Sequence, residues 1–371
     1  MSRHIPFGLA LSTAVAAGLL LLSQLGATDP SQPAKEAPKA EAKAEAPAAP
    51  VKPKPISETV KKGLAYLINQ QHADGGWGQG GGWRQADQGG GRVEGANVAD
   101  PSDVADTCMA LLALIRAGHT PKEGEYAKQV ARGVDFVLTK IEKADKDSLY
   151  VTDVRNTQIQ VKIGPYVDTF MAQLVMAELK GKMPNDKDEK RLVAAFDKTM
   201  AKLAKHQDKD GNFAKNEAWA STLSMALCSK GINRAAQNGF LVPQPVLAAD
   251  QKANTAGLDV ATGRFAAPAG GAAGDAGIQL YSFSGKTAGL QEAVNTLKKD
   301  EEKNRKTVDS PTAPKEEKEK AKSELTRLED AEKAQKAAVE GLINSTAHLD
   351  LDFLIFVSSP PERRCSEGSQ G

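Results

Sequence analysis

The chain has 371 residues, enough for one globular core with appendages, and its formal net charge is +1 at pH 7. A nearly neutral chain has no general electrostatic attraction to nucleic acids or anionic membrane surfaces, so we expect no nucleic-acid partner. Aromatic residues make up only 5% of the chain, while Ala, Lys and Glu are abundant, which favours helices over a β-sandwich. Cys108, Cys228 and Cys365 lie far apart, which argues against a disulfide framework or a zinc site.

The first 27 residues have the layout of a secretory signal. Arg3 and His4 precede an apolar run that ends at Leu22, and Ala27 is a small residue at the position of a cleavage site. An uncleaved N-terminal anchor is the alternative, because Leu25 suits cleavage poorly. Residues 28–55 are a tract of Ala, Pro, Lys and Glu, which buries too little apolar surface to fold and is expected to be a disordered linker. The folded part is therefore expected to be periplasmic or extracellular, or membrane-anchored by the N-terminal segment.

Apolar residues recur at helical spacing over residues 56–232 and predict three helix pairs. In each pair an amphipathic helix with one apolar stripe precedes a helix that is apolar almost all round. The first helices begin near Ile56, Tyr126 and Leu192, and the second helices cover Val104–Ile115, Val167–Ala177 and Trp219–Lys230. The second helix of each pair must be covered on more than one side, so we expect it to be the inner one. Residues 79–99 are rich in glycine and predict an exposed, mobile loop.

The second half of the chain loses this periodicity. Residues 233–289 are rich in Gly, Ala and Pro and are expected to be irregular, with a short strand at 278–283. Residues 290–344 are charged and predict a helical hairpin, with the character of a coiled coil, that projects as an arm. Residues 345–371 form an atypical tail that does not continue the helix pairs. We expect that the C-terminus departs from a longer ancestral chain, through truncation or a shifted reading frame.

One short pattern connects this chain to a known family. A basic residue and a glycine, an aromatic residue, a glutamine and a closing Gly-Gly-Trp occur at Lys62, Gly63, Tyr66, Gln70 or Gln71, and Gly75–Trp77. This pattern resembles the prenyltransferase and squalene-oxidase repeat, or QW motif, of the squalene-hopene cyclase and protein prenyltransferase β-subunit superfamily. A second copy at Gln207–Phe213 ends in Phe, and a third at Arg132–Leu138 keeps only the helical half. The resemblance covers about Ile56 to Gly231.

The resemblance implies an all-α fold of the α/α toroid type, in which helix pairs form a ring around an apolar cavity. Three pairs are about half of the family's ring, so we expect an incomplete ring with possible self-association at its open edge. In these relatives the motif ties neighbouring helices together. Structural roles are therefore assigned to Gly63, Gln71, Gly75, Trp77, Gln207, Gly211 and Phe213.

The residues that perform chemistry in these relatives are not found. The nearest strings to the Asp-x-Asp-Asp acid of the cyclases are Asp186–Glu189 and Asp350–Asp352, in a charged helix start and in the tail. No set of zinc ligands matches, His72 and His206 are interpreted as polar surface residues, and we expect no metal and no cofactor. Asp106 and Asp168, at equivalent positions of two inner helices, are the remaining catalytic candidates. They either cap a helix or form a carboxylate pair that acts as acid and base or binds a sugar.

Three functions stay open at this point. The first is an exported, non-catalytic binding or scaffold protein that holds an unknown protein or apolar ligand on the concave inner face, with the charged arm mediating assembly. The second is an isoprenoid-class enzyme, a terpenoid cyclase or a prenyltransferase-like transferase, with divergent catalytic residues. The third is a carbohydrate-active enzyme, by analogy of fold alone.

Overall fold

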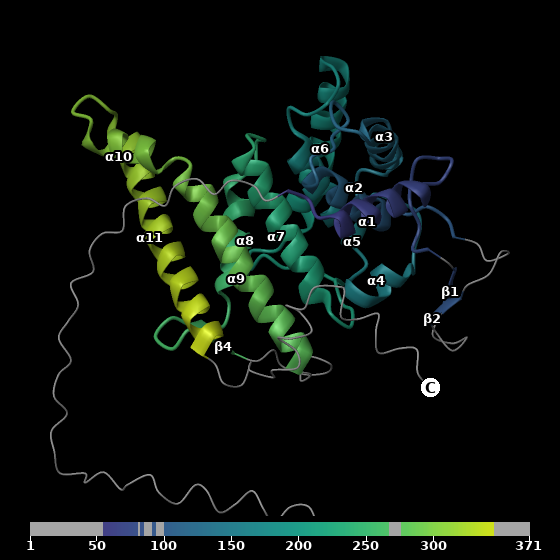
Figure 1. Cartoon of the computed structure of the whole chain (residues 1–371). Helices are drawn as coiled ribbons and strands as arrows, with labels where there is room; N and C mark the ends of the chain where they lie inside the picture. Colours follow the sequence, from purple (N-terminus) through teal and green to yellow (C-terminus); the bar gives the residue numbers. More distant parts are fainter. Residues whose placement is uncertain (1–54, 81, 85–90, 94–99, 267–275, 345–371) are drawn as a thin grey trace, which may run out of the picture. The chain divides into compact units, whose positions relative to one another are not determined.

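The computed structural model describes residues 55–80, 82–84, 91–93, 100–266 and 276–344, and most of these residues are helical (Figure 1). The expected signal or anchor, nearly all of the linker, and the tail from residue 345 onward lie outside the described residues. The helices are α1 (Glu58–Asn69), α2 (Val104–Arg116), α3 (Ala127–Lys143), α4 (Gln158–Ile163), α5 (Val167–Leu179), α6 (Asp186–His206), α7 (Ser221–Gln237), α8 (Gln244–Thr255), α9 (Ala276–Lys298), α10 (Glu301–Asp309) and α11 (Lys315–Asn344). Two antiparallel strand pairs complete the set, β1 (Gly82–Arg84) with β2 (Gly91–Val93) and β3 (Leu258–Asp259) with β4 (Arg264–Phe265).

Polar side chains fix where several helices begin. The Ser57 hydroxyl accepts a hydrogen bond from the Val60 N–H at the start of α1, and the Asp103 carboxylate accepts one from the Asp106 N–H at the start of α2. Asn185 does the same for α6. Each cap satisfies a backbone donor that has no partner inside the helix.

Helices lie where the sequence predicts the members of the three pairs, as α1, α2, α3, α5, α6 and α7. The second helices pack in a row, since α2 contacts α5, α5 contacts α7, and α7 contacts α9, while α3 contacts α2 and α6. Helix α5 is buried on nearly all sides, with Phe170, Leu174 and Met176 fully covered. Its even distribution of apolar residues follows from this position, because a helix with neighbours all round has no solvent-facing side.

Residues 233–289 differ from the irregular segment that the sequence predicts. Helix α8 lies inside this range, and α9 begins at Ala276, so the described part of the expected strand at 278–283 is helical. Pro243 is the N-cap of α8 and Pro245 lies in its first turn. A proline is compatible with a helix at these positions because the first N–H groups have no intrahelical acceptor in any case.

Helices α9 and α11 lie side by side in Figure 1, and α9 also contacts α7. Leu290 packs with Ala334 and Ala338, and Val294 packs with Leu328. These contacts differ from the expected projecting arm, because α9 is covered by α7 on one side and by α11 on another. The residues in contact are small and aliphatic side chains within a largely charged stretch of sequence.

The glycine-rich range 79–99 also differs from a plain loop, because β1 and β2 pair within it, with Trp83 opposite Arg92. All described residues except Pro55 belong to one compact unit. In that part of the chain, no helix combines the length and apolar character that a membrane crossing requires.

Candidate functional site at the start of helix α2

Two turns of the chain have the same hydrogen-bond pattern. After α1, the His72 N–H donates to the Gly76 carbonyl (2.9 Å) and the Gly75 N–H donates to the His72 carbonyl (3.0 Å). After α6, the Asp208 N–H donates to the Asn212 carbonyl (2.9 Å) and the Gly211 N–H donates to the Asp208 carbonyl (3.0 Å). Gly75 and Gly211 both have positive φ values, +90° and +82°. The turn geometry is therefore repeated as well as the residue pattern.

The first turn is tied to its neighbours by the motif side chains. The Gln71 Nε2 donates to the carbonyls of Gly75 and Gln129, both at 2.8 Å, so it links the turn to α3. The buried Trp77 indole donates to the Leu67 carbonyl at 2.7 Å. These bonds join the turn to α1 and to α3.

The other motif residues contribute unequally. Phe213 is buried against Phe170, with ring centroids 5.0 Å apart, and Gln207 pairs with Phe213 across the second turn. Gly63 lies in α1, where an added Cβ would meet no atom within 4 Å. Packing against the described residues therefore does not require a glycine at position 63.

The candidate Asp168 is fully buried and caps a helix other than its own. Its Oδ1 accepts the Ala105 N–H (3.1 Å) at the start of α2, and its Oδ2 accepts the Gln160 Nε2 (2.6 Å) from α4. Burial raises the pKa of Asp168 to about 6, against the lowering effect of the Gln160 hydrogen bond. A carboxylate at a helix N-terminus is also stabilised by the helix dipole.

The candidate Asp106 lies half-buried in the first turn of α2, beside the N-cap residue Asp103. Burial, together with a hydrogen bond to the Asp106 carboxyl group, raises the pKa of Asp103 to about 8. Burial also raises the pKa of Asp106, and repulsion from the nearby Asp168 carboxylate raises it as well. The structure thus places Asp103, which the sequence did not single out, beside Asp106 and within electrostatic range of Asp168.

His72, which the sequence indicated as a polar surface residue, makes side-chain contacts close to the start of α2. The His72 Nδ1 lies 2.9 Å from the Ser102 Oγ, the His72 Nε2 lies 3.7 Å from an Asp100 carboxylate oxygen, and the Ser102 hydroxyl donates to Asp74 at 2.8 Å. A serine, a histidine and an aspartate in contact suggest a nucleophile and its base. The serine has only one proton, however, and Asp74 receives it, so His72 must donate to Ser102 rather than accept from it. The arrangement therefore holds the turn against the start of α2. His72 and Ser102 are 30 positions apart in the chain, and a single sequence gives no sign that two such residues are in contact.

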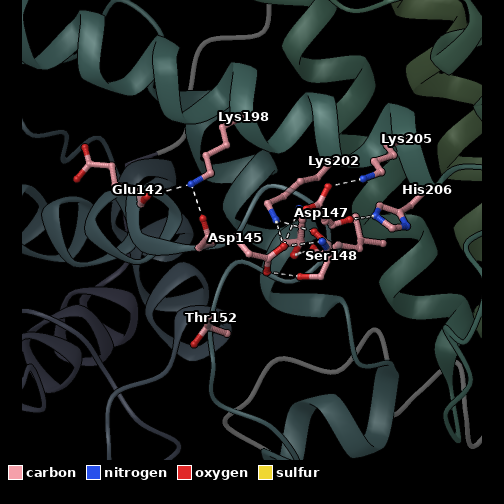
Figure 2. Close-up of polar contacts among 12 residues, drawn as sticks. Glu142, Asp145, Asp147, Ser148, Thr152, Lys198, Lys202, Lys205 and His206 are labelled. Atoms are coloured by element: carbon pink, nitrogen blue, oxygen red, sulfur yellow. Dashed lines mark hydrogen bonds and ion pairs between the residues drawn. The ribbon is translucent and has the colours of Figure 1, made fainter.

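A second polar cluster lies where α6 meets the loop after α3. Figure 2 shows Lys198, Lys202 and His206 reaching from α6 to backbone carbonyls of this loop region. The acceptors are the carbonyls of Glu142 and Ala144 for Lys198, of Ser148 for Lys202, and of Asp147 for His206. Burial lowers the pKa of Lys202, whose side chain is almost completely covered. Because these groups are all engaged with backbone, the cluster holds the loop in place.

Neither cluster is suited to a metal ion. The described residues contain no group of three or more His, Cys, Asp or Glu side chains arranged to hold one. Cys108 and Cys228 are buried free thiols, and burial raises the pKa of both, which disfavours the reactive thiolate.

Comparisons with protein-family models, with curated proteins and with solved structures find no match to this chain.

Proposed function

We propose that the chain is an exported, non-catalytic binding or scaffold protein of the prenyltransferase and squalene-oxidase repeat type. Its helix pairs would form an incomplete α/α toroid that presents its inner helices to a partner protein or an apolar ligand. The observation that carries this proposal is the turn built twice with the same hydrogen bonds around Gly75 and Gly211. A recurring contact between successive units is typical of repeat proteins, and such proteins present extended binding surfaces.

Contacts of the two turns support the repeat interpretation. An added Cβ at Gly75 would lie 2.6 Å from the Arg132 carbonyl oxygen in α3. An added Cβ at Gly211 would press against the Ala249 carbonyl oxygen in α8. Each turn thus meets the first helix of the following pair, which makes α8 with α9 a fourth pair.

The positions of the carboxylates support a non-catalytic role. Both carboxylate oxygens of Asp168 accept hydrogen bonds from groups of the protein, and the Asp103 side chain caps α2. A general acid or base needs an oxygen or proton directed at a substrate. Helix capping accounts for both residues without one.

One observation favours an isoprenoid-class enzyme as a second candidate. The raised pKa of Asp103 keeps this carboxyl protonated near neutral pH, beside the second carboxyl of Asp106. A carboxyl group must hold its proton before it can transfer it to an alkene, and the raised pKa meets this condition while also making Asp103 a weaker acid. In this alternative, Asp103 is the proton donor and the pair replaces the absent Asp-x-Asp-Asp string.

The two candidates are separated by product analysis on the purified full chain. The protein is incubated with squalene and, separately, with farnesyl diphosphate, and extracts are analysed by mass spectrometry, together with an Asp103→Asn variant and the Asp106→Asn, Asp168→Asn double variant. The binding proposal predicts no product from any of them. A product that the wild type forms and the folded Asp103→Asn variant does not would establish the enzyme instead.

A further inference from the structure

A cavity of about 360 Å³ lies where α7, α8, α9 and α10 meet the first half of α11. Apolar side chains form much of its wall, among them Phe240, Leu247 and Leu297. Pockets for small molecules range from roughly 300 to 1,000 Å³ and combine apolar walls with a few polar groups. This cavity lies at the small end of that range.

The polar residues on the inner wall are already engaged with each other. The Thr296 hydroxyl donates to the Asn233 Oδ1 (2.9 Å), and the Asn233 Nδ2 donates to the buried Asp250 carboxylate (2.8 Å). A ligand group placed here would find its hydrogen-bonding partners occupied. The inner wall therefore suits an apolar body rather than a charged group.

Basic side chains outnumber acidic ones around the cavity. Lys299, Lys303, Lys320 and Arg327 line it, against Asp300 and Glu324. Lys299 donates to the Gln237 carbonyl (3.0 Å) at the end of α7, and Arg327 pairs with Glu324 (3.0 Å).

Two of these cations are available to a ligand. Among the described residues, the ammonium groups of Lys303 and Lys320 have no hydrogen-bond or ion-pair partner, and both side chains are exposed. They come from α10 and α11, and both line the cavity. Opposite charge placed between them would be attracted from both helices.

The side chain of Leu241 lines the cavity and is also exposed on the protein surface. Leu241 is 89% exposed and lines the cavity next to the buried Phe240. A single exposed leucine is ordinary on a protein surface, but here it continues an apolar wall. It would cover part of a ligand held below it.

We propose that this cavity binds a small organic anion, a carboxylate or sulfonate carried on a compact apolar body. The apolar body would lie against Phe240, Leu247 and Leu297, and the anionic group would lie between Lys303 and Lys320. This proposal rests on the proposed function as a binding protein and names its ligand class. It places the ligand at the α7–α11 end of the described chain, away from the carboxylate cluster of α2.

The test uses two fluorescent probes that differ in charge and share an apolar body. 1-Anilinonaphthalene-8-sulfonate is anionic and N-phenyl-1-naphthylamine is neutral, and both are titrated with the full-length protein at low and high salt. The variants are Lys303→Gln, Lys320→Gln together, with Lys315→Gln, Lys318→Gln as a matched pair outside the cavity lining. Leu247→Trp fills the cavity, and circular dichroism establishes that each variant is folded.

We expect the sulfonate to bind more tightly than the neutral probe and to weaken as salt is added, because exposed charges are screened. The Lys303, Lys320 double variant should lose about tenfold in sulfonate affinity, and the control pair less than about twofold. A folded Leu247→Trp variant should bind neither probe well. Equal binding of both probes, or unchanged sulfonate binding in the folded Leu247→Trp variant, would overturn the proposal. Product formation by the wild type, which would refute the binding function itself, is measured separately and does not depend on these lysines.

Discussion

The glycine of the repeated turn provides the sharpest test of this structure. Gly75 combines a φ of +90° with an approach so close that an added Cβ would lie 2.6 Å from the Arg132 carbonyl oxygen. Gly181 shares the positive φ (+76°) but has open space at its Cβ position, and Gly63 is helical with open space. Alanine at these three positions therefore separates backbone strain from the contact between α1's turn and α3.

The expected effects follow from these surroundings. At Gly63, alanine should stabilise the protein by about 0.5–1 kcal/mol, because glycine is the poorer helix former. At Gly181 it should destabilise by about 1 kcal/mol, since a left-handed conformation costs an L-residue roughly 1–2 kcal/mol, partly offset by a less flexible unfolded chain. At Gly75 the crowding against a backbone oxygen adds about 1–3 kcal/mol, for a total of about 2–4 kcal/mol.

Urea unfolding followed by circular dichroism measures the free energy of unfolding of each variant, and an unchanged urea dependence shows that the three can be compared. Fluorescence of the buried Trp77 should report loosening of the turn in Gly75→Ala. If Gly75→Ala cost no more than Gly181→Ala, the close joint between the turn and Arg132 would not exist. The assignment of repeated joints would then lose its main support.

Three further predictions concern buried polar groups. Because the folded pKa of Asp168 is raised to about 6, its contribution to stability is present at low pH and is lost as pH rises from about 4 through 6, by about 3 kcal/mol; urea unfolding at pH 4.5 and 7.5 should show about 2 kcal/mol of this loss in addition to the losses from Asp103 and Asp250, whose pKa values are also raised, and Asp168→Asn should keep only the losses from these other groups. Lys202→Met leaves the Ser148 carbonyl without its donor and should cost about 1–3 kcal/mol in urea unfolding, whereas the exposed Lys205→Met should cost under about 0.5 kcal/mol. Trp77→Phe removes the indole donor to Leu67 and should lower the free energy of unfolding by about 1–2 kcal/mol.

The sequence predicted the helices whose burial is one-sided or complete, because their apolar spacing reflects their surroundings directly. Helix α5 is the clearest case, apolar almost all round and buried almost all round. Helix α8 was missed because Pro243 and Pro245 were interpreted as breaking regular structure, although both lie at a helix start. The two prolines correctly indicated a boundary of regular structure. The sequence alone did not show that this boundary is the start of a helix.

The candidate site was predictable only in part. Asp106 and Asp168 could be found because they occupy equivalent places in two helices. The bond from Ala105 to Asp168, and the contact of His72 with Ser102, join residues far apart in the chain. One sequence contains no trace of such pairing, so the capping role of Asp168 on a neighbouring helix had to come from the structure.

The two turns share their backbone hydrogen bonds although their large side chains differ. Trp77 uses its N–H to bond the Leu67 carbonyl in the helix before the turn. Phe213 has no such donor, and its ring packs against Phe170 from α5 instead. Both side chains are buried, and both glycines press their turn against the next helix. What the two turns share is therefore a glycine at the close approach and a large buried ring beside it. If they are joints of the proposed repeat, these contacts identify a helix pair better than the motif residues do.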